Sequence, residues 1–161
     1  MKTIKYTKAV IKKVDLNDIY NGSAEALRKL DLNIIEVVKT EAPITLNLLK
    51  ARLREAFDLA KISQKALDII SDRIKQLGYK MTDNLYDKVL WPTTGVFDID
   101  YLRISYPRQI YDIPYQELKN LVNHIGKHGE ELYRDILKYF GYEVLTKKAK
   151  DYLIFVEKKS K

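Results

Sequence analysis

The fold of this chain is decided by residues 41–91, which read EAPITLNLLKARLREAFDLAKISQKALDIISDRIKQLGYKMTDNLYDKVLW. Pro43 separates two helices, because the residue before a proline is pushed out of the helical region of backbone space. Thr45 and Ser63 are favourable N-cap residues, and apolar residues follow each of them at the three-to-four spacing of one buried stripe. This pattern predicts two amphipathic helices in succession.

A further helix is predicted before these two helices, and a β-ribbon is predicted after them. Ser23 caps an earlier amphipathic helix, so that three helices follow one another. Gly78 ends the third helix, and residues 79–91, with a polar turn at 82–84, predict a short β-ribbon. Three helices followed by a ribbon within residues 21–92 are the order of a winged-helix module.

The rest of the chain predicts a connector and a second helical unit. Residues 93–113 contain two short apolar-rich pieces, 96–99 and 101–106, and are interpreted as a connector with strand-like pieces. Residues 114–161 carry three further apolar stripes at helical spacing and end in a basic tail. The expected fold is therefore mainly α with a small β component, a winged-helix-like module followed by a second three-helix unit.

The composition excludes several classes of protein. The 161 residues suffice for one domain or two small ones, and 46% hydrophobic with 32% charged residues is typical of a folded globular chain. The absence of cysteine rules out disulfides, cysteine-based zinc sites and thiol catalysis. No apolar run approaches the roughly 20 residues of a membrane span, and residues 1–14 lack the apolar region of a secretory signal. A cytoplasmic location without membrane partners is expected.

The net charge of +7 is concentrated at the two ends of the chain. Residues 1–14 hold five lysines and no acid, within a basic arm (residues 1–20) that could also form an edge strand. Residues 147–161 hold six lysines and two acids, and residues 15–146 are slightly acidic. Because Lys and Arg gain affinity for phosphates by releasing counterions, both ends are candidate nucleic-acid contacts. Lysines on an edge strand are equally an ordinary protection against aggregation.

The second and third helices add to these candidates. The helix after the turn enters the major groove in helix-turn-helix proteins, and the outward Gln64, Lys65 and Ser71 are suited to contact bases or phosphates. Asp68 and Asp72 lie on the same side and would repel the backbone, which argues against a dedicated sequence reader. A solvated face with ion pairs is an equally good interpretation. The predicted nucleic-acid-binding residues are Lys5, Lys8, Lys12, Lys13, Lys50, Arg52, Arg54, Lys65, Lys75, Lys147, Lys148 and Lys150.

Aromatic residues in and beside the connector are candidates for contact with a partner. The chain has twelve tyrosines and one tryptophan. Rings near lysines can stack on unpaired bases, whereas rings at the ends of helices and strands more often close a core. The predicted partner-binding residues are Trp91, Tyr101, Tyr106 and Tyr111.

Residues able to carry catalysis are few. His124 and His128 are four apart, but an intervening glycine predicts a helix end rather than a metal-binding pair. Asp98 and Asp100 would need a third carboxylate such as Asp112 to hold a divalent ion, and such pairs are common in turns. The sequence contains no phosphate-cradling glycine loop and no common hydrolase motif. The chain is therefore expected to be non-enzymatic, with no cofactor, no metal site and no small-molecule substrate.

A family resemblance covers most of the chain, roughly residues 35–158. It rests on the ordered motifs Glu41-Ala42-Pro43-Ile44, Arg52-Leu53-Arg54-Glu55-Ala56-Phe57, Leu90-Trp91-Pro92, Ile113-Pro114 with Glu117-Leu118, and Phe140-Gly141-Tyr142. In these the chain resembles a C-terminal domain of unknown function in large bacterial proteins related to superfamily 1 DNA helicases, often beside a restriction-type nuclease domain. The resemblance implies a non-catalytic accessory module, and it carries over no catalytic residue. The basic arm has no counterpart in that family, and residues 147–150 place lysine where arginine is expected.

Two main functional hypotheses follow. The first is an accessory domain of a helicase-type DNA-processing protein that contacts DNA through its basic ends and one helix face. The second is a protein-interaction or structural module that docks on the helicase or nuclease domains of its parent without touching nucleic acid. A minor third hypothesis is a metal-dependent enzyme that uses Asp98 and Asp100.

Overall fold

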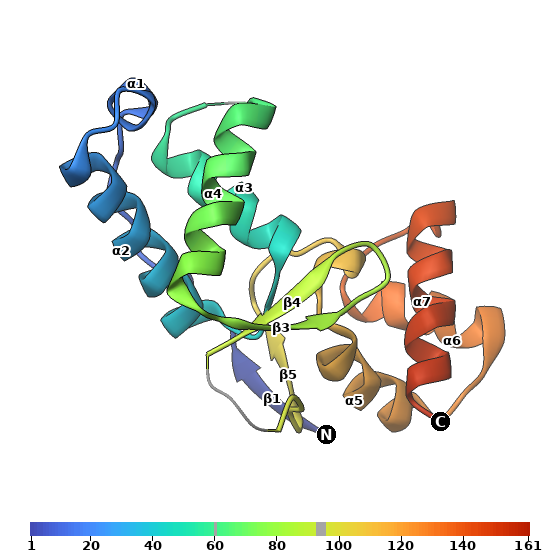
Figure 1. Ribbon diagram of the computed structural model, residues 1–161. Coiled ribbons are helices and arrows are strands. Elements are labelled where there is room, and N and C mark those ends of the chain that lie inside the picture. Colours follow the sequence, from blue (N-terminus) through green and yellow to red (C-terminus); the bar gives the residue numbers. More distant parts are fainter. Residues whose placement is uncertain (60, 93–95) are drawn as a thin grey trace. The chain divides into compact units, whose positions relative to one another are not determined.

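The computed structural model describes residues 1–59, 61–92 and 96–161, which are mainly helical with a small β component, as the sequence predicts (Figure 1). The chain divides into two compact units. The first, which we call the ribbon unit, consists of Thr7–Thr82 and Lys88–Gly95. The second, the C-terminal unit, consists of Met1–Tyr6, Asp83–Asp87 and Val96–Lys161. The arm expected at residues 1–20 is thus shared between the two units.

The ribbon unit alternates helices with short strands. Its elements are α1 (Leu16–Tyr20), α2 (Ala24–Glu41), β2 (Ile44–Thr45), α3 (Leu46–Ala56), α4 (Gln64–Leu77), β3 (Lys80–Asp83) and β4 (Lys88–Trp91). The strands form one sheet in the order β2-β4-β3, with β2 antiparallel to β4. The side chains of Ser23, Thr45 and Ser63 accept hydrogen bonds from the third backbone N–H beyond them, so all three predicted N-caps are confirmed.

Two short elements of this unit were not predicted. Helix α1 begins after Asp15, whose carboxylate accepts a hydrogen bond from the backbone N–H of Asn17. Strand β2 is only two residues long, which is too short for an alternating pattern to show, and its Thr45 also caps α3. The ribbon itself forms, but its loop lies between Asp83 and Lys88 rather than at residues 82–84.

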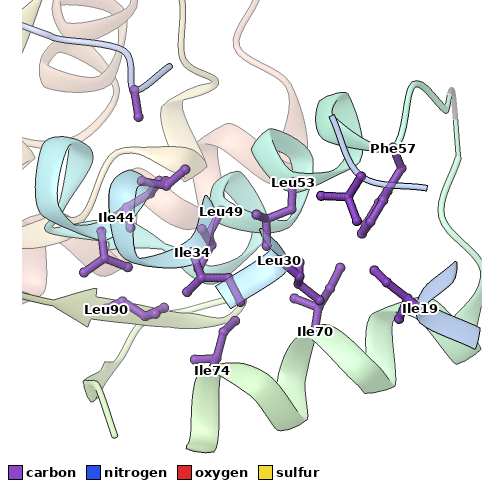
Figure 2. Packing of buried hydrophobic residues seen from close by; sticks show 14 of the residues in the cluster. Ile19, Leu30, Ile34, Ile44, Leu49, Leu53, Phe57, Ile70, Ile74 and Leu90 are labelled. Carbon is purple, nitrogen blue, oxygen red and sulfur yellow. The ribbon is translucent and has the colours of Figure 1, made fainter. Parts of the chain in front are cut away.

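One hydrophobic core holds the ribbon unit together (Figure 2). Side chains from α2, α3 and α4 meet there, and β2 and β4 close it from the side of the sheet. The labelled residues are Ile19, Leu30, Ile34, Ile44, Leu49, Leu53, Phe57, Ile70, Ile74 and Leu90. The apolar stripes of three separate helices thus bury one another, which fixes α3 and the start of α4 relative to each other.

The C-terminal unit combines a two-stranded parallel sheet with three helices. Its elements are β1 (Lys2–Lys5), β5 (Tyr101–Ile104), the 3-10 helix η1 (Ile110–Asp112), α5 (Tyr115–Ile125), α6 (Gly129–Tyr139) and α7 (Lys147–Lys159). Strand β1 pairs in parallel with β5, so the edge strand expected in the arm is limited to four residues. Of the two strand-like pieces of the connector, only the second forms a strand. A separate core unites β5 with the three helices.

A buried ionic cluster lies beside β5 in this unit. The carboxylate of Glu117 accepts hydrogen bonds from the guanidinium groups of Arg103, at 3.0 Å, and Arg108, at 2.6 Å. Both guanidinium groups also lie over the ring of Tyr6, at 4.9 and 4.8 Å from its centroid, and Tyr6 stacks on Tyr106. Burial raises the pKa of the Glu117 carboxyl group, but the hydrogen bonds and charges of the two arginines outweigh burial and hold this pKa below its ordinary value. Arg103 and Arg108 therefore stabilise the fold of the C-terminal unit by neutralising the buried Glu117.

Throughout the described parts of the chain, no helix is both long and apolar enough to span a membrane.

Candidate nucleic-acid interface

A groove opens in the ribbon unit between the outer face of α3 and the beginning of α4. It has a volume of about 330 Å³. Four of its residues recur at the spacing of one face of α3, and the others come from the loop before α4 and from the first turns of α4. We call this hollow the α3–α4 groove; it is lined by Asn47, Lys50, Ala51, Arg54, Lys61, Ile62 and Leu67.

Three cationic side chains converge on the α3–α4 groove. Lys50 is half-buried, whereas Arg54 and Lys61 are exposed. None of the three forms an ion pair with a carboxylate in residues 1–59, 61–92 or 96–161. The acid nearest along α3, Glu55, is engaged elsewhere, since it pairs with Arg52 at 2.5 Å and with Lys8 at 3.4 Å. The groove is therefore a concentration of uncompensated positive charge.

Arg52 does not belong to this face, and its prediction as one of the nucleic-acid-binding residues is wrong because its side chain is buried. Its side chain is only 1% exposed. The guanidinium group donates from Nε to the carboxylate of Glu41, at 3.1 Å, and from Nη2 to the backbone carbonyl of Ala9, at 2.7 Å. The arm of the chain covers this side of α3, a contact between residues 43 positions apart that helical spacing cannot reveal.

The basic arm is fastened to the ribbon unit rather than free. Asn33 of α2 both accepts a hydrogen bond from the backbone N–H of Lys12, at 2.9 Å, and donates one to the backbone carbonyl of Lys12, at 2.8 Å. The backbone N–H of Ala9 donates to Glu41. The side chains of Lys12 and Lys13 remain exposed, as does that of Lys5 in the C-terminal unit.

The predicted lysines of α4 point outward but share their face with acids. Lys65 lies 4.4 Å from the centroid of the Tyr20 ring, and Lys75 is exposed. Asp68 and Asp72 are exposed on the same side, as the sequence analysis expected. The outer face of α4 therefore carries as much negative as positive charge.

The lysines of the basic tail are mostly engaged within the C-terminal unit. Lys147 pairs with Asp151 at 3.6 Å, and Lys150 pairs with Glu130 at 2.8 Å. Lys148 places its ammonium group 3.9 Å from the centroid of the Tyr111 ring. Because these lysines already have partners within the unit, the basic tail is a weaker candidate for phosphate binding than the sequence suggested.

The aromatic candidates divide into one core residue and three half-buried rings. Trp91 is only 4% exposed and donates from Nε1 to the hydroxyl of Thr82, at 2.9 Å, so it packs inside the ribbon unit and offers no surface to a partner. Tyr106 stacks on Tyr6, and Tyr111 lies under Lys148. Tyr101, on β5, is half-buried.

The candidate catalytic and metal-binding residues do not form one centre. His124 is on α5, which ends at Ile125, and His128 precedes α6, so the two do not share a helix. Asp98 pairs with Lys119 at 2.5 Å and Asp100 lies 4.0 Å from Lys2. In the part of the chain that the structure describes, no three His, Asp or Glu side chains are grouped so as to hold a metal ion.

Lys61 is the cation of the α3–α4 groove that sequence analysis missed. It stands two positions before the N-cap Ser63, in a stretch with no helical spacing to link it to α3. Only the packing of α4 against the ribbon core brings Lys61 to the groove that Lys50 and Arg54 line.

The comparisons with known proteins gave no relative. No protein-family model, no curated protein and no solved structure matches this sequence.

Proposed function

We propose that the ribbon unit is a winged-helix module that binds DNA, and that the chain serves as a non-catalytic accessory domain. The order of elements supports this proposal: helix α2, strand β2, helices α3 and α4, then the ribbon β3–β4, with β4 between its two partners in the sheet. This is the order of a winged helix, in which the helix pair corresponds to α3 and α4 and the strands that carry the wing correspond to β3 and β4.

The observation that carries the proposal is the α3–α4 groove. Lys50, Arg54 and Lys61 line one hollow, and no ion pair with the described residues neutralises them. Keeping three like charges together costs free energy through mutual repulsion. An arrangement of this kind is stabilised when phosphates neutralise it and release their counterions.

The parent context is proposed from the sequence resemblance. An accessory module with a basic groove is suited to a helicase-type DNA-processing protein, where the motor and nuclease supply the chemistry. The alternative, a module that docks on those domains through its aromatic residues, has less support, because Trp91 is buried and Tyr106 is stacked on Tyr6.

Salt-dependent DNA binding tests the proposal. We would measure fluorescence anisotropy of a labelled duplex of about 20 base pairs between ~50 and ~200 mM salt. The triple variant K50Q/R54Q/K61Q should flatten the plot of log affinity against log salt by about two to three units, because each lost phosphate contact removes about 0.9.

The matched control is the triple variant R134Q/K138Q/K158Q. It removes the same charge from exposed positions of α6 and α7 and should leave the slope within about one unit of the unmodified protein, since those residues are expected to contact no phosphate. Circular dichroism confirms that both triple variants remain folded. An equal loss of affinity in the two variants, or no binding at the lowest salt, would show that the groove is not a DNA site.

A further inference from the structure

We infer that the α3–α4 groove holds the phosphodiester backbone of DNA without reading its base sequence. This inference rests on the proposed function and specifies its substrate class. Winged-helix and helix-turn-helix modules obtain sequence specificity when the helix after the turn reaches base edges, and the wing supplies a further contact. In this chain both of those elements are poorly suited to their role, whereas the backbone-binding groove is well formed.

The outward row of α4 cannot readily read bases. Gln64, Asp68, Ser71 and Lys75 are exposed and recur at the spacing of one helix face. Gln64 is the residue type that recognises adenine through both atoms of its amide group. Here its Nε2 donates to Asp68 Oδ1 at 2.8 Å, so a contact with adenine would first have to break this hydrogen bond.

Charge also keeps α4 out of the major groove. Asp68 and Asp72 are exposed on the face that would enter DNA, where their carboxylates would meet phosphates. Lys65, which could offset them, lies over the Tyr20 ring. The outer face of α4 therefore provides no net attraction for DNA, in contrast to the three cations of the α3–α4 groove.

The ribbon loop is not available as a wing. Its residues, Asn84-Leu85-Tyr86-Asp87, include no cation, and they belong to the C-terminal unit. The hydroxyl of Tyr86 donates to the backbone carbonyl of Lys148 at 3.0 Å, and the ring of Tyr86 stacks on Tyr152. The hydroxyl of Tyr152 in turn lies 3.2 Å from Asn84 Oδ1, to which it donates. A loop held in this way is not free to enter the minor groove.

The α3–α4 groove has the chemistry of a backbone site. Lys50 and Lys61 offer ammonium groups that suit phosphates in many orientations, and Arg54 adds a guanidinium group. The rest of the lining consists of Ala51, Ile62 and Leu67, whose side chains have no hydrogen-bonding group with which to select a base edge, and of Asn47, which does carry an amide group. Asn47 is already engaged in an interaction within the chain. The groove therefore binds the phosphodiester backbone, which is the same in every DNA sequence.

Competition between duplexes of equal length tests this inference. We would displace a labelled duplex from the unmodified protein with unlabelled A·T-rich, G·C-rich and mixed duplexes at one salt concentration. Backbone recognition predicts dissociation constants within about threefold of one another, because a single lost base contact already costs about 1–3 kcal/mol, which is roughly 5- to 150-fold. The variant Gln64→Ala should leave all three constants unchanged.

The outcomes separate the inference from the proposed function. If K50Q/R54Q/K61Q flattens the salt slope but one duplex binds more than about thirtyfold tighter, and Gln64→Ala removes that preference, DNA binding stands and backbone-only recognition is wrong. If no duplex binds, or the triple variant leaves the salt slope unchanged, the proposed function itself fails. If the three duplexes bind with equal affinity and this binding depends on Lys50, Arg54 and Lys61, both DNA binding and backbone-only recognition are supported.

Discussion

The guanidinium group of Arg52 is enclosed by hydrogen-bond acceptors from three parts of the chain. Nε donates to Glu41, Nη1 donates to Glu55, and Nη2 donates to the carbonyl of Ala9. A buried charge is tolerated only when it is paired and hydrogen-bonded in this way. The pair of Glu41 and Arg52 therefore stabilises the contact between α2, α3 and the arm, and it cannot take part in binding.

Substitution of this arginine tests its structural role. Arg52→Gln should lower the free energy of unfolding by about 3 kcal/mol, because removing one partner of a buried ion pair leaves the other charge without compensation. The matched change Arg54→Gln, on the exposed side of the same helix, should alter stability by no more than about 0.5 kcal/mol. Urea denaturation followed by circular dichroism measures both, and equal stabilities of the two variants would contradict the role assigned to Arg52.

Helix α4 combines an apolar inner face with an outer face on which two acids, Asp68 and Asp72, are exposed. Its inner face is apolar, with Ile70 and Ile74 in the core (Figure 2). On its outer face, Asp68 follows directly after Leu67, which lines the α3–α4 groove. Asp68 is thus next in sequence to a residue of the groove lining, and if DNA binds there, we expect the carboxylates of α4 to repel its phosphates.

Neutralising these acids should strengthen DNA binding. We expect D68N/D72N to raise affinity several-fold at ~50 mM salt, with a smaller gain at ~200 mM because salt screens the repulsion. The control E25Q/E36Q removes the same charge from exposed positions of α2 and should have a smaller effect. The anisotropy titration described above measures both variants. An unchanged affinity in D68N/D72N would place the DNA backbone away from α4.

Across the whole molecule, the basic N-terminal arm is a structural part of both compact units. In the C-terminal unit, Lys2–Lys5 form β1 and Tyr6 packs under Arg103 and Arg108. In the ribbon unit, Ala9 and Lys12 are hydrogen-bonded to α2 and α3 side chains. The lysines of the arm contribute charge, but its backbone contributes contacts that each unit needs.

Deletion and neutralisation of the arm should therefore have different consequences. Removing residues 1–13 should abolish or greatly weaken cooperative unfolding, because it removes a strand from one unit and, from the other, the Ala9 backbone groups that hydrogen-bond to Glu41 and Arg52. The variant K5Q/K12Q/K13Q keeps the backbone and should unfold within about 4 °C of the unmodified protein, as surface changes usually do. Thermal denaturation followed by near-ultraviolet circular dichroism compares the two. A truncated chain as stable as the triple variant would show that the arm is dispensable.

Predictions that depended on neighbours in sequence were mostly correct. The N-caps at Ser23, Thr45 and Ser63 and the left-handed glycine at Gly78 agree with the structure, because a cap is a hydrogen bond or a backbone angle within one turn. The two-residue strand β2 was missed because it is too short for a pattern, and its pairing with β4 joins residues far apart in sequence.

The sequence by itself determined the helical class, the order of helices and ribbon, and the acids on α4. Only the tertiary structure decided which cations remain unpaired, burying Arg52 against Glu41 and bringing Lys61 to the groove of Lys50 and Arg54. The physical reason is that helical periodicity sets which side of a helix faces its own core. What covers the opposite side depends on distant segments, whose packing no local pattern encodes.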